Sequence, residues 1–407
     1  MTSVESVGSD DRLARVTRVW RSNGLKPSTI ACYQKWLRIF RADVRHRGQS
    51  EQSLLTSSEV RSFASRYSRR RGIGRENVWC GARCALRAWS WGLAACGESV
   101  PDWAPASSPT ASPSPLLADF ARYRREVRGV AESTLSLETD DLIAFLKFLR
   151  SRRRGPLRVR LTDIDAYVIE LRKRLALRTV ARVCTSIRAF LRFLHATGRL
   201  PFDFASSVAA PTLRWRSELP RALPWRDVRI ILSAIDRKCR VGRRDYALLL
   251  AMAVYGLGAG EVRSLSLDDV DWAGGTFRVR RPKTGREIVL PLLPAVARAL
   301  LGYLRSGRPK HTASRALFVK MHCPYDALPS SSAIRHILIK HAHAAGIDGP
   351  FLGSHALRHS HATRQIDLGV LPKLVGDILG HLTPASTSIY ARVALRRLRH
   401  VALPVPR

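Results

Sequence analysis

Acidic side chains are scarce in this sequence. Among its 407 residues, Asp and Glu together number 32 while Lys and Arg number 69, which gives a formal net charge of +37. Only 10 of the 69 cations are lysines; a GC-rich coding sequence would favour arginine, but it would not explain the shortage of acids. A soluble chain with this imbalance repels itself unless a polyanion neutralises it. Nucleic acid, bound through its phosphates, is therefore the expected partner.

Long apolar runs are also missing. Each hydrophobic stretch is interrupted by Arg or another polar residue before it reaches the length of a membrane span. The N-terminus has no basic start followed by an apolar stretch, so no signal peptide is expected. A membrane surface would favour one concentrated basic segment beside a lipid-facing helix, whereas these arginines are spread along the chain. We expect a cytoplasmic protein with no membrane partner.

The pattern also lacks paired cysteines and metal-ligand clusters. The seven cysteines are odd in number and scattered, which is typical of reduced thiols. Cys80 and Cys84 lie one helical turn apart, but no second pair of ligands follows them. His355, His359 and His361 recur along one segment, but no carboxylate there would complete a metal site. The sequence predicts no metal, no cofactor and no small-molecule substrate.

Hydrophobic residues make up 45% of the chain, which is enough to build the cores of two or three domains. Two proline-containing segments interrupt the helical periodicity, a Pro/Ser-rich stretch at residues 101–115 and a second break at 205–222. The segments between them are predicted to be an N-terminal helical module (1–100), a second helical module (116–204), a third block (223–394) and a basic tail (395–407).

The two helical modules share three features in the same order. Each has an amphipathic helix opening on Ser-Thr, then a helix with a Thr near its start, then an aromatic helix that runs toward a proline. These features fall at Ser28, Thr56 and Pro101 in the first module, and at Ser133, Thr162 and Pro201 in the second. Any two amphipathic segments share some of this pattern, but the matching order favours two related modules.

The third block has a mixed pattern. Residues 276–281 and 286–292 alternate as strands do, and the intervening Pro-Lys-Thr-Gly is typical of a tight hairpin turn. Helical periodicity occupies residues 225–235, 244–255, a stretch opening at Pro294, and most of the chain after Ser354. We expect a mainly helical α/β domain with a small antiparallel sheet.

A group of polar residues lies toward the C-terminus. Ser354 can cap a helix that carries His355 and Arg358, which are three residues apart and share a face. A helix N-terminus with an imidazole and a guanidinium is suited to bind a phosphate. His381 follows a second helix, and Tyr390 lies nine residues later in a short helix. Tyr390 alone would more often be a packing aromatic, so its interpretation depends on the joint pattern.

That joint pattern resembles the tyrosine recombinase (phage integrase) family. Residues 353–359, the Leu-Gly-His at 379–381 and Tyr390 resemble its C-terminal boxes, with matching spacing. Residues 256–265 resemble its first box, and Lys283 at the hairpin tip resembles its catalytic lysine. The layout also resembles members of the family that are encoded in tandem sets on bacterial mobile elements.

The resemblance extends over residues 223–394 and, more loosely, over 116–201. It implies a multidomain fold with helical, SAM-like core-binding modules and a mixed α/β, mainly helical catalytic domain. It also implies a C-shaped clamp around the duplex, and strand exchange by a homo- or hetero-tetramer of related recombinases. The activity implied is site-specific DNA recombination in DNA integration or transposition. A basic C-terminal tail could pack on a neighbouring subunit or lie along DNA.

The residue types suit this chemistry. Tyr390 would attack the phosphorus, leaving a 3′-phosphotyrosyl link and a free 5′-hydroxyl, so no ATP is required. By the resemblance, Arg358, His355 and His381 would stabilise the charge on the non-bridging oxygens. Lys283 would give a proton to the leaving 5′-oxygen, since a lysine can shift its pKa and an arginine cannot.

One position departs from the family pattern. The first box of the family reads Gly-Leu-Arg, and Gly258 stands where that arginine belongs. Arg263 is five residues further on, about 140° around a helix, and would need an irregular backbone to reach the same phosphate. Loss of one such donor costs roughly a hundredfold to a thousandfold in rate in comparable sites.

Three hypotheses follow from Gly258. The first is a slow or specialised recombinase, and the second is a DNA-binding accessory subunit that works beside an active relative. The third is a DNA-binding regulator without catalysis, but a pure binder would not need Lys283, Tyr390 and their three partners. A type IB topoisomerase would share the chemistry, and nothing beyond the chemistry favours it.

Overall fold

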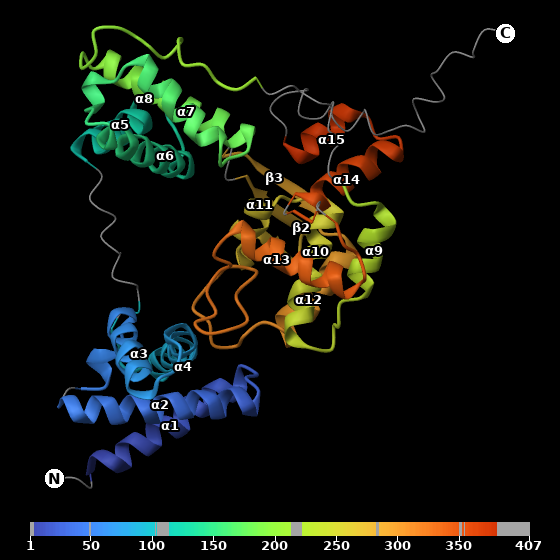
Figure 1. Cartoon of the computed structure of the whole chain (residues 1–407). Helices are drawn as coiled ribbons and strands as arrows, with labels where there is room; N and C mark the ends of the chain where they lie inside the picture. The colour runs from blue at the N-terminus through green and yellow to red at the C-terminus, as the bar shows by residue number, and fades with distance from the viewer. Residues whose placement is uncertain are drawn as a thin grey trace. The chain divides into compact units, whose positions relative to one another are not determined.

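The structure is a computed structural model, and it forms two compact units. One combines residues 1–106 with residues 218–407, and the other consists of residues 107–217. Figure 1 shows the course of the chain through both. The residues that the structure describes are 4–48, 50–101, 103, 114–212, 222–281, 285–349, 352–353 and 355–380.

The N-terminal module is built from four helices (Figure 1, blue). They are α1 (Val4–Ser22), α2 (Pro27–Arg47), α3 (Ser57–Arg71) and α4 (Arg75–Ala95), with a 3₁₀ turn at Gln52–Leu54 between α2 and α3. Helix α4 packs against the other three, around a core that contains Trp20, Phe40 and Trp89. Thr56 caps α3 by accepting a hydrogen bond from the backbone N–H of Glu59 at 3.3 Å, as its sequence pattern predicts.

The middle module repeats this order of elements. Its helices are α5 (Pro115–Glu126), α6 (Glu132–Ser151), α7 (Leu161–Arg172) and α8 (Leu177–Ala196), with a 3₁₀ turn at Pro156–Arg158 between α6 and α7. Here α8 packs against the other three helices. Helix α7 begins one residue before Thr162, and the backbone N–H of Arg160 donates to the Asp163 carboxylate at 3.2 Å. Ala205 and Val208, in the predicted second linker, are buried in this module's core.

The C-terminal part is mainly helical and contains one small sheet. Strands β1 (Val270–Asp271), β2 (Thr276–Arg280) and β3 (Glu287–Pro291) are antiparallel in the order β1-β2-β3, so the expected hairpin strands form. The tip of that hairpin lies outside the described residues. The helices are α9 (Trp225–Ser233), α10 (Arg240–Tyr255), α11 (Ala259–Ser264), α12 (Pro294–Ser306), α13 (Ser331–Ala344), α14 (Ala356–Asp367) and α15 (Pro372–Leu379).

Helix α10 is the centre of this part's core. It packs against α9, α11, α12 and α14, and its stretch Ala247–Ala253 is buried. It begins at Arg240, earlier than the expected 244, because the Cys239 sulfur caps it by accepting from the backbone N–H of Gly242 at 3.3 Å. Asp245 ties α10 to α13, since its carboxylate lies 2.8 Å from Nε2 of His341. Burial would raise the pKa of Asp245, but the hydrogen bond from His341 and the charge of Arg244 lower it overall.

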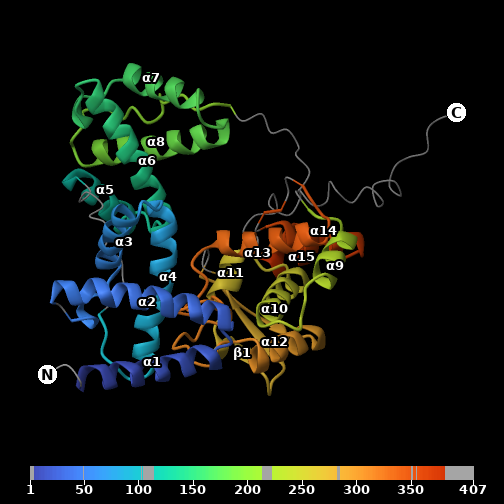
Figure 2. The same ribbon diagram turned by 60° about the horizontal axis from the view of Figure 1, so that its bottom comes forward.

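The loop between α12 and α13, residues 307–330, joins the C-terminal part to the N-terminal module. Tyr325 on this loop is buried within the module's hydrophobic core, and its ring meets the ring of Trp91 edge-on with centroids 5.0 Å apart. The backbone N–H of His311 donates to Oδ1 of Asn23 at 3.2 Å. The loop runs beside α4 (Figure 2), so the N-terminal module shares its core with the C-terminal part.

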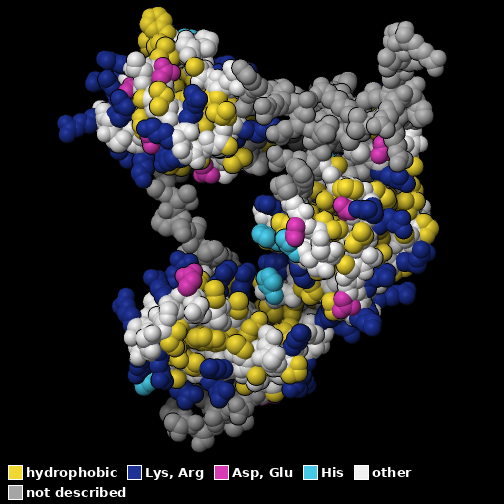
Figure 3. All heavy atoms as spheres, turned by 45° about the vertical axis from the view of Figure 1, so that its right-hand side comes forward, with side chains coloured by type: hydrophobic (Ala, Val, Ile, Leu, Met, Phe, Trp, Pro, Cys, Tyr) yellow, Lys and Arg dark blue, Asp and Glu magenta, His cyan; other side chains and the backbone are white. Residues whose placement is uncertain are grey.

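The surface reflects the excess of arginine. Lys and Arg side chains are scattered over the face drawn in Figure 3, and Asp and Glu are few there. Within the described ranges, no helix is both long and apolar enough to span a membrane. The same residues hold no group of three or more His, Cys, Asp or Glu side chains arranged to bind a metal ion.

Candidate active site

The structure describes two of the five residues that the sequence assigns to catalysis. His355 and Arg358 lie at the start of α14, which begins at Ala356 with His355 as its N-cap residue. Lys283, His381 and Tyr390 lie outside the described residues, as does the predicted capping residue Ser354. The site can therefore be built around Arg358.

Arg358 is held where three segments meet. Its Nη1 donates to the backbone oxygen of Gly256 at 3.1 Å and to Oε2 of Glu261 at 2.9 Å. Its Nη2 donates to the backbone oxygen of Leu379, the last residue of α15. With 13% of its side chain exposed, the guanidinium is fixed by α11, α14 and α15 together, as an anion-binding group should be.

Gly258 lies directly beside this guanidinium. It is the N-cap residue of α11, with φ −75° and ψ 156°, a backbone conformation open to any residue. Its N–H donates to Oε2 of Glu261 at 2.7 Å. A Cβ placed on Gly258 would lie 3.7 Å from Nη1 of Arg358 and 3.5 Å from the Glu261 carboxylate, which are ordinary contacts. A side chain at position 258 would thus start next to Arg358, and glycine leaves that place empty.

Arg263 does not fill the place. Its side chain is exposed, and its Nη1 donates to the backbone oxygen of Pro329 at 3.4 Å. That contact directs it toward the loop before α13 and away from Arg358. The irregular backbone that it would need is not observed, because α11 is a regular helix from Ala259 to Ser264.

A different arginine, which was not among the predicted site residues, lies beside Glu261. Arg281 follows β2, and 8% of its side chain is exposed. Its Nη1 lies 3.7 Å from Oε1 of Glu261, and its Nη2 donates to the backbone oxygen of Ile378 in α15. Burial lowers the pKa of Arg281; Glu261 acts against this, while Arg358 adds to it. We call Arg281, Glu261 and Arg358 the arginine cluster.

Strand alternation was the signal for Arg281. Along β2, Phe277 and Val279 are buried while Arg278 and Arg280 are exposed. Arg281 continues on the inward side, and its backbone N–H still pairs with the oxygen of Arg286 at 2.9 Å. An inward-facing cation at the end of a strand needs an anionic partner.

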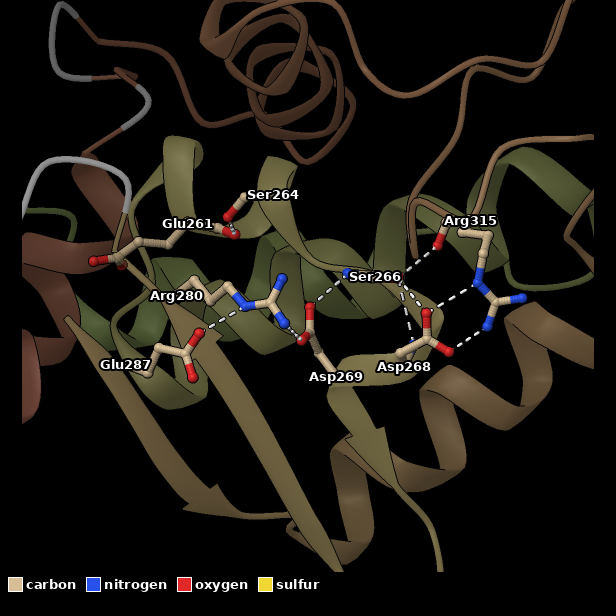
Figure 4. Close-up of polar contacts among 8 residues, drawn as sticks. All are labelled: Glu261, Ser264, Ser266, Asp268, Asp269, Arg280, Glu287 and Arg315. Atoms are coloured by element: carbon tan, nitrogen blue, oxygen red, sulfur yellow. Dashed lines mark hydrogen bonds and ion pairs between the residues drawn. The ribbon is translucent and has the colours of Figure 1, made fainter. Parts of the chain in front are cut away.

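Glu261 is presented by a helix that is tied to the sheet. After α11, the backbone N–H of Ser266 donates to Asp269 at 2.8 Å, and Arg280 of β2 lies 3.6 Å from the same carboxylate group. Arg280 also donates to Glu287 of β3 at 2.8 Å. Figure 4 shows these contacts, with the Glu261 carboxylate directed away from them. Glu261 is therefore free of the surface network and is available to the arginine cluster.

The histidines of α14 have different surroundings. His355 is exposed at the N-cap, and its ring centroid lies 6.3 Å from that of His359. His361 is buried; its Nδ1 lies 3.1 Å from the backbone oxygen of Ala253, and burial lowers its pKa. Its ring also packs against Gly256, where a Cβ would come within 2.7 Å of it. His361 therefore belongs to the core beneath the arginine cluster.

Comparisons with known proteins agree with this organisation. Residues 222–397 match the phage integrase family, and residues 117–198 match the phage integrase N-terminal SAM-like domain. Putative integrase/recombinase y4rA of Sinorhizobium fredii is 35% identical over 288 residues, 70% of this chain and 70% of that protein. Tyrosine recombinase XerC of Pelotomaculum thermopropionicum is 31% identical over 297 residues, 70% of this chain and 95% of that protein.

A solved structure supports the fold. The chain resembles the XerH site-specific recombinase bound to palindromic difH substrate in a post-cleavage complex, with a TM-score of 0.57 and 15% identity. The likeness covers 87% of this chain and 97% of that chain. The expected fold class, with a helical SAM-like module and a mainly helical domain containing a small antiparallel sheet, is confirmed.

Proposed function

The chain belongs to the phage integrase family of tyrosine recombinases, and we propose that it breaks and rejoins DNA at specific sites through a covalent 3′-phosphotyrosyl bond to Tyr390. The process served would be DNA integration or the transposition of a mobile element. No nucleotide cofactor is needed, because the bond energy is kept in the phosphotyrosyl link.

The proposed reaction is one in-line exchange at phosphorus. The phenolic oxygen of Tyr390 loses its proton and bonds to the phosphorus, and the bond to the 5′-oxygen breaks. Lys283 supplies a proton to that leaving oxygen, so the proton lost by the phenol is balanced by the one gained. Arg358, His355 and His381 stabilise the non-bridging oxygens. Religation is the reverse reaction, with another 5′-hydroxyl as the nucleophile.

The anchoring of Arg358 carries this proposal. The guanidinium is mostly buried, yet it sits at the first turn of α14, beside His355 and within a site made by three helices. Fixing a cation in this way lowers the reorganisation that the transition state requires.

Double-stranded DNA is the proposed partner. The formal net charge of +37 favours binding to phosphates, and the XerH structure is itself a complex with its palindromic difH substrate. We further propose a tetramer of this chain or of this chain with related recombinases, and a cytoplasmic, nucleoid-associated location. The division into residues 1–100, 116–204, 223–394 and 395–407, with linkers between the first three, also stands as a proposal.

A covalent-capture experiment tests the proposal. The full chain is incubated with a pool of nicked suicide duplexes with randomised arms, and covalent complexes are enriched over several rounds. The enriched duplex should give an adduct that survives denaturing electrophoresis. Tyr390→Phe should abolish that adduct while binding persists in a native gel. An adduct that survives in Tyr390→Phe would contradict the assignment of the nucleophile.

Gly258 favours one second candidate, a DNA-binding accessory subunit with little activity of its own. In that case the chain would retard duplex DNA in a salt-dependent way, but it would form no adduct alone. Gly258→Arg is a direct test, because a Cβ fits at this position. An adduct that appears only in Gly258→Arg would favour the accessory role.

A further inference from the structure

We propose that Arg281 supplies the scissile-phosphate cation that the family obtains from the arginine missing at Gly258. The inference rests on the proposed recombinase function. It assigns a phosphate-binding role to a residue two positions before Lys283, on the strand that leads into the hairpin.

The Glu261 carboxylate links Arg281 to the vacant position. One of its oxygens accepts from the N–H of Gly258 at 2.7 Å and from Arg358 at 2.9 Å. Its other oxygen lies 3.7 Å from Nη1 of Arg281. A single carboxylate therefore contacts the empty position and both guanidinium groups. Arg281 approaches from β2, across the site from the helix that would have carried the family's arginine.

The positive charge of the arginine cluster is only partly neutralised by Glu261. Two guanidinium groups share one carboxylate, so the described cluster carries one net positive charge while each of its side chains is at most 13% exposed. A largely buried charge is costly unless an opposite charge joins it. A phosphodiester carries one negative charge and would neutralise the cluster. The arginine cluster is therefore electrostatically complementary to a single DNA phosphate.

Hydrogen-bond donors also remain for that phosphate. A guanidinium has five N–H groups. Among the described residues, Arg358 uses two on Nη1 and one on Nη2, which leaves Nε and one Nη2 hydrogen. Arg281 uses Nη2 toward Ile378 and directs Nη1 toward Glu261. Both guanidinium groups therefore keep donors for an anion without giving up their anchors.

Two glycines make room for this arrangement. Gly380 has φ +67°, and a Cβ there would overlap the guanidinium of Arg281. Gly258 offers no side chain, so no third guanidinium competes for Glu261. An arginine at position 258 would bring three cations to one carboxylate, which like-charge repulsion opposes. Arginines at 258 and 281 are thus alternatives for one role.

Arg281 could instead act only as a brace for α15, through its bond to Ile378. A substrate with altered charge separates the two roles. In a methylphosphonate, one charged non-bridging oxygen is replaced by a methyl group, so the linkage is neutral and needs less cationic stabilisation. If Arg281 binds the phosphate, its loss should slow cleavage of the methylphosphonate less than cleavage of the phosphodiester. If Arg281 only positions α15, its loss should slow cleavage of both substrates equally.

The experiment measures the rate of adduct formation on the enriched nicked duplex, with a phosphodiester or a methylphosphonate at the scissile position. Arg281→Ala should lose about a hundredfold to a thousandfold on the phosphodiester. Most of that loss should disappear on the methylphosphonate. Arg278→Ala is the matched control, because it removes another exposed arginine of the same strand and should change neither rate by more than about threefold.

A position swap makes the test stricter. Gly258→Arg in the Arg281→Ala background should restore most of the phosphodiester rate. Equal losses of Arg281→Ala on both substrates, or no loss at all, would overturn the proposal and leave the recombinase function intact. Failure of the unsubstituted chain to form an adduct on either substrate would overturn the recombinase function, and the role of Arg281 with it.

Discussion

The N-terminal and middle modules follow the same plan but complete their cores differently. Each has two helices, a 3₁₀ turn and two more helices, and in each the last helix packs against the other three. The middle module closes its core with its own residues. The N-terminal module incorporates Cys323 and Tyr325 from a loop more than 200 residues away in sequence. The same order of helices thus forms a separate compact unit in the middle module and part of a larger unit in the N-terminal module.

The largest loss of stability is expected when Tyr325, which the C-terminal part contributes to the core of the N-terminal module, is truncated. Tyr325→Ala should destabilise the unit that contains both ends of the chain by about 3–5 kcal/mol, because a large buried ring leaves a cavity. Phe120→Ala is the matched change in the middle module, where Phe120 is fully buried.

Fluorescence distinguishes the two variants. No residue from 114 to 212 is Trp, so in a Trp215→Phe background tryptophan emission reports only on the unit with the N- and C-terminal parts. Tyr325→Ala should lower the midpoint of the fluorescence-detected denaturation, while Phe120→Ala should lower only a transition seen by far-UV circular dichroism. If Phe120→Ala shifts both signals equally, the modules unfold together and the contrast is wrong.

A smaller effect is expected from the polar contacts within each core. In the middle module, Asp141 is 9% exposed and accepts from Ser186 at 2.8 Å and from Arg182. In the N-terminal module, Glu51 accepts from Arg41 at 2.8 Å and from Nε1 of Trp89 at 2.6 Å.

Asp141→Asn should cost about 1–3 kcal/mol, since a buried charge-assisted bond is lost. Glu51→Gln should cost less, about 0.5–1 kcal/mol, because its side chain is 26% exposed and water can compensate. Denaturation followed by circular dichroism for the first variant and by tryptophan emission for the second gives both values. A larger loss from Glu51→Gln would reverse the ranking.

The smallest expected difference is in pH dependence. Burial raises the pKa of Tyr33 in the N-terminal module from 10.0 to about 12. Its contribution is therefore present below pH 10 and lost as the pH rises toward 12. In the middle module, the hydrogen bond from Arg199 lowers the pKa of Asp119 from 3.8, so that contribution is present above pH 3.8 and lost as the pH falls further.

Tyr33→Phe should therefore reduce the alkaline loss of stability detected by tryptophan emission. Asp119→Asn should reduce the acid loss detected by circular dichroism. Titrating each variant beside the unsubstituted chain checks both signs. An unchanged alkaline profile in Tyr33→Phe would show that another buried phenol dominates.

The sequence predicted those features that short-range patterns encode. The capping pattern at Thr56 located the start of α3, and alternation located β2 and β3. The motif around Arg358 located the start of α14, although its N-cap residue is His355 and not the predicted Ser354. Catalytic roles for Lys283, His381 and Tyr390 remain predictions, since these residues are not described. The common order of elements in the two helical modules was also visible, because it depends on the succession of helices rather than on distant contacts.

Long-range contacts could not be predicted in the same way. Tyr325 lies in an irregular loop, and nothing near it in sequence identifies the core built from α1, α2, α3 and α4 as the place where it packs. Arg281 carried a local signal, but its relation to Glu261 depends on how α11 and β2 pack. Periodicity gives the side of a strand that is buried and does not give the group that it will meet.

The overlap between Arg281 and a Cβ at Gly380 has a consequence for how this lineage can evolve. Position 380 can accept a larger residue without overlap only after position 281 has become smaller, and its φ of +67° favours glycine even then. Under the proposed role, 281 can become smaller without loss of activity only after an arginine has returned at 258. The order of these steps is fixed, so the three positions should covary among related chains. Among related chains, those with arginine at position 258 should show many residue types at position 281.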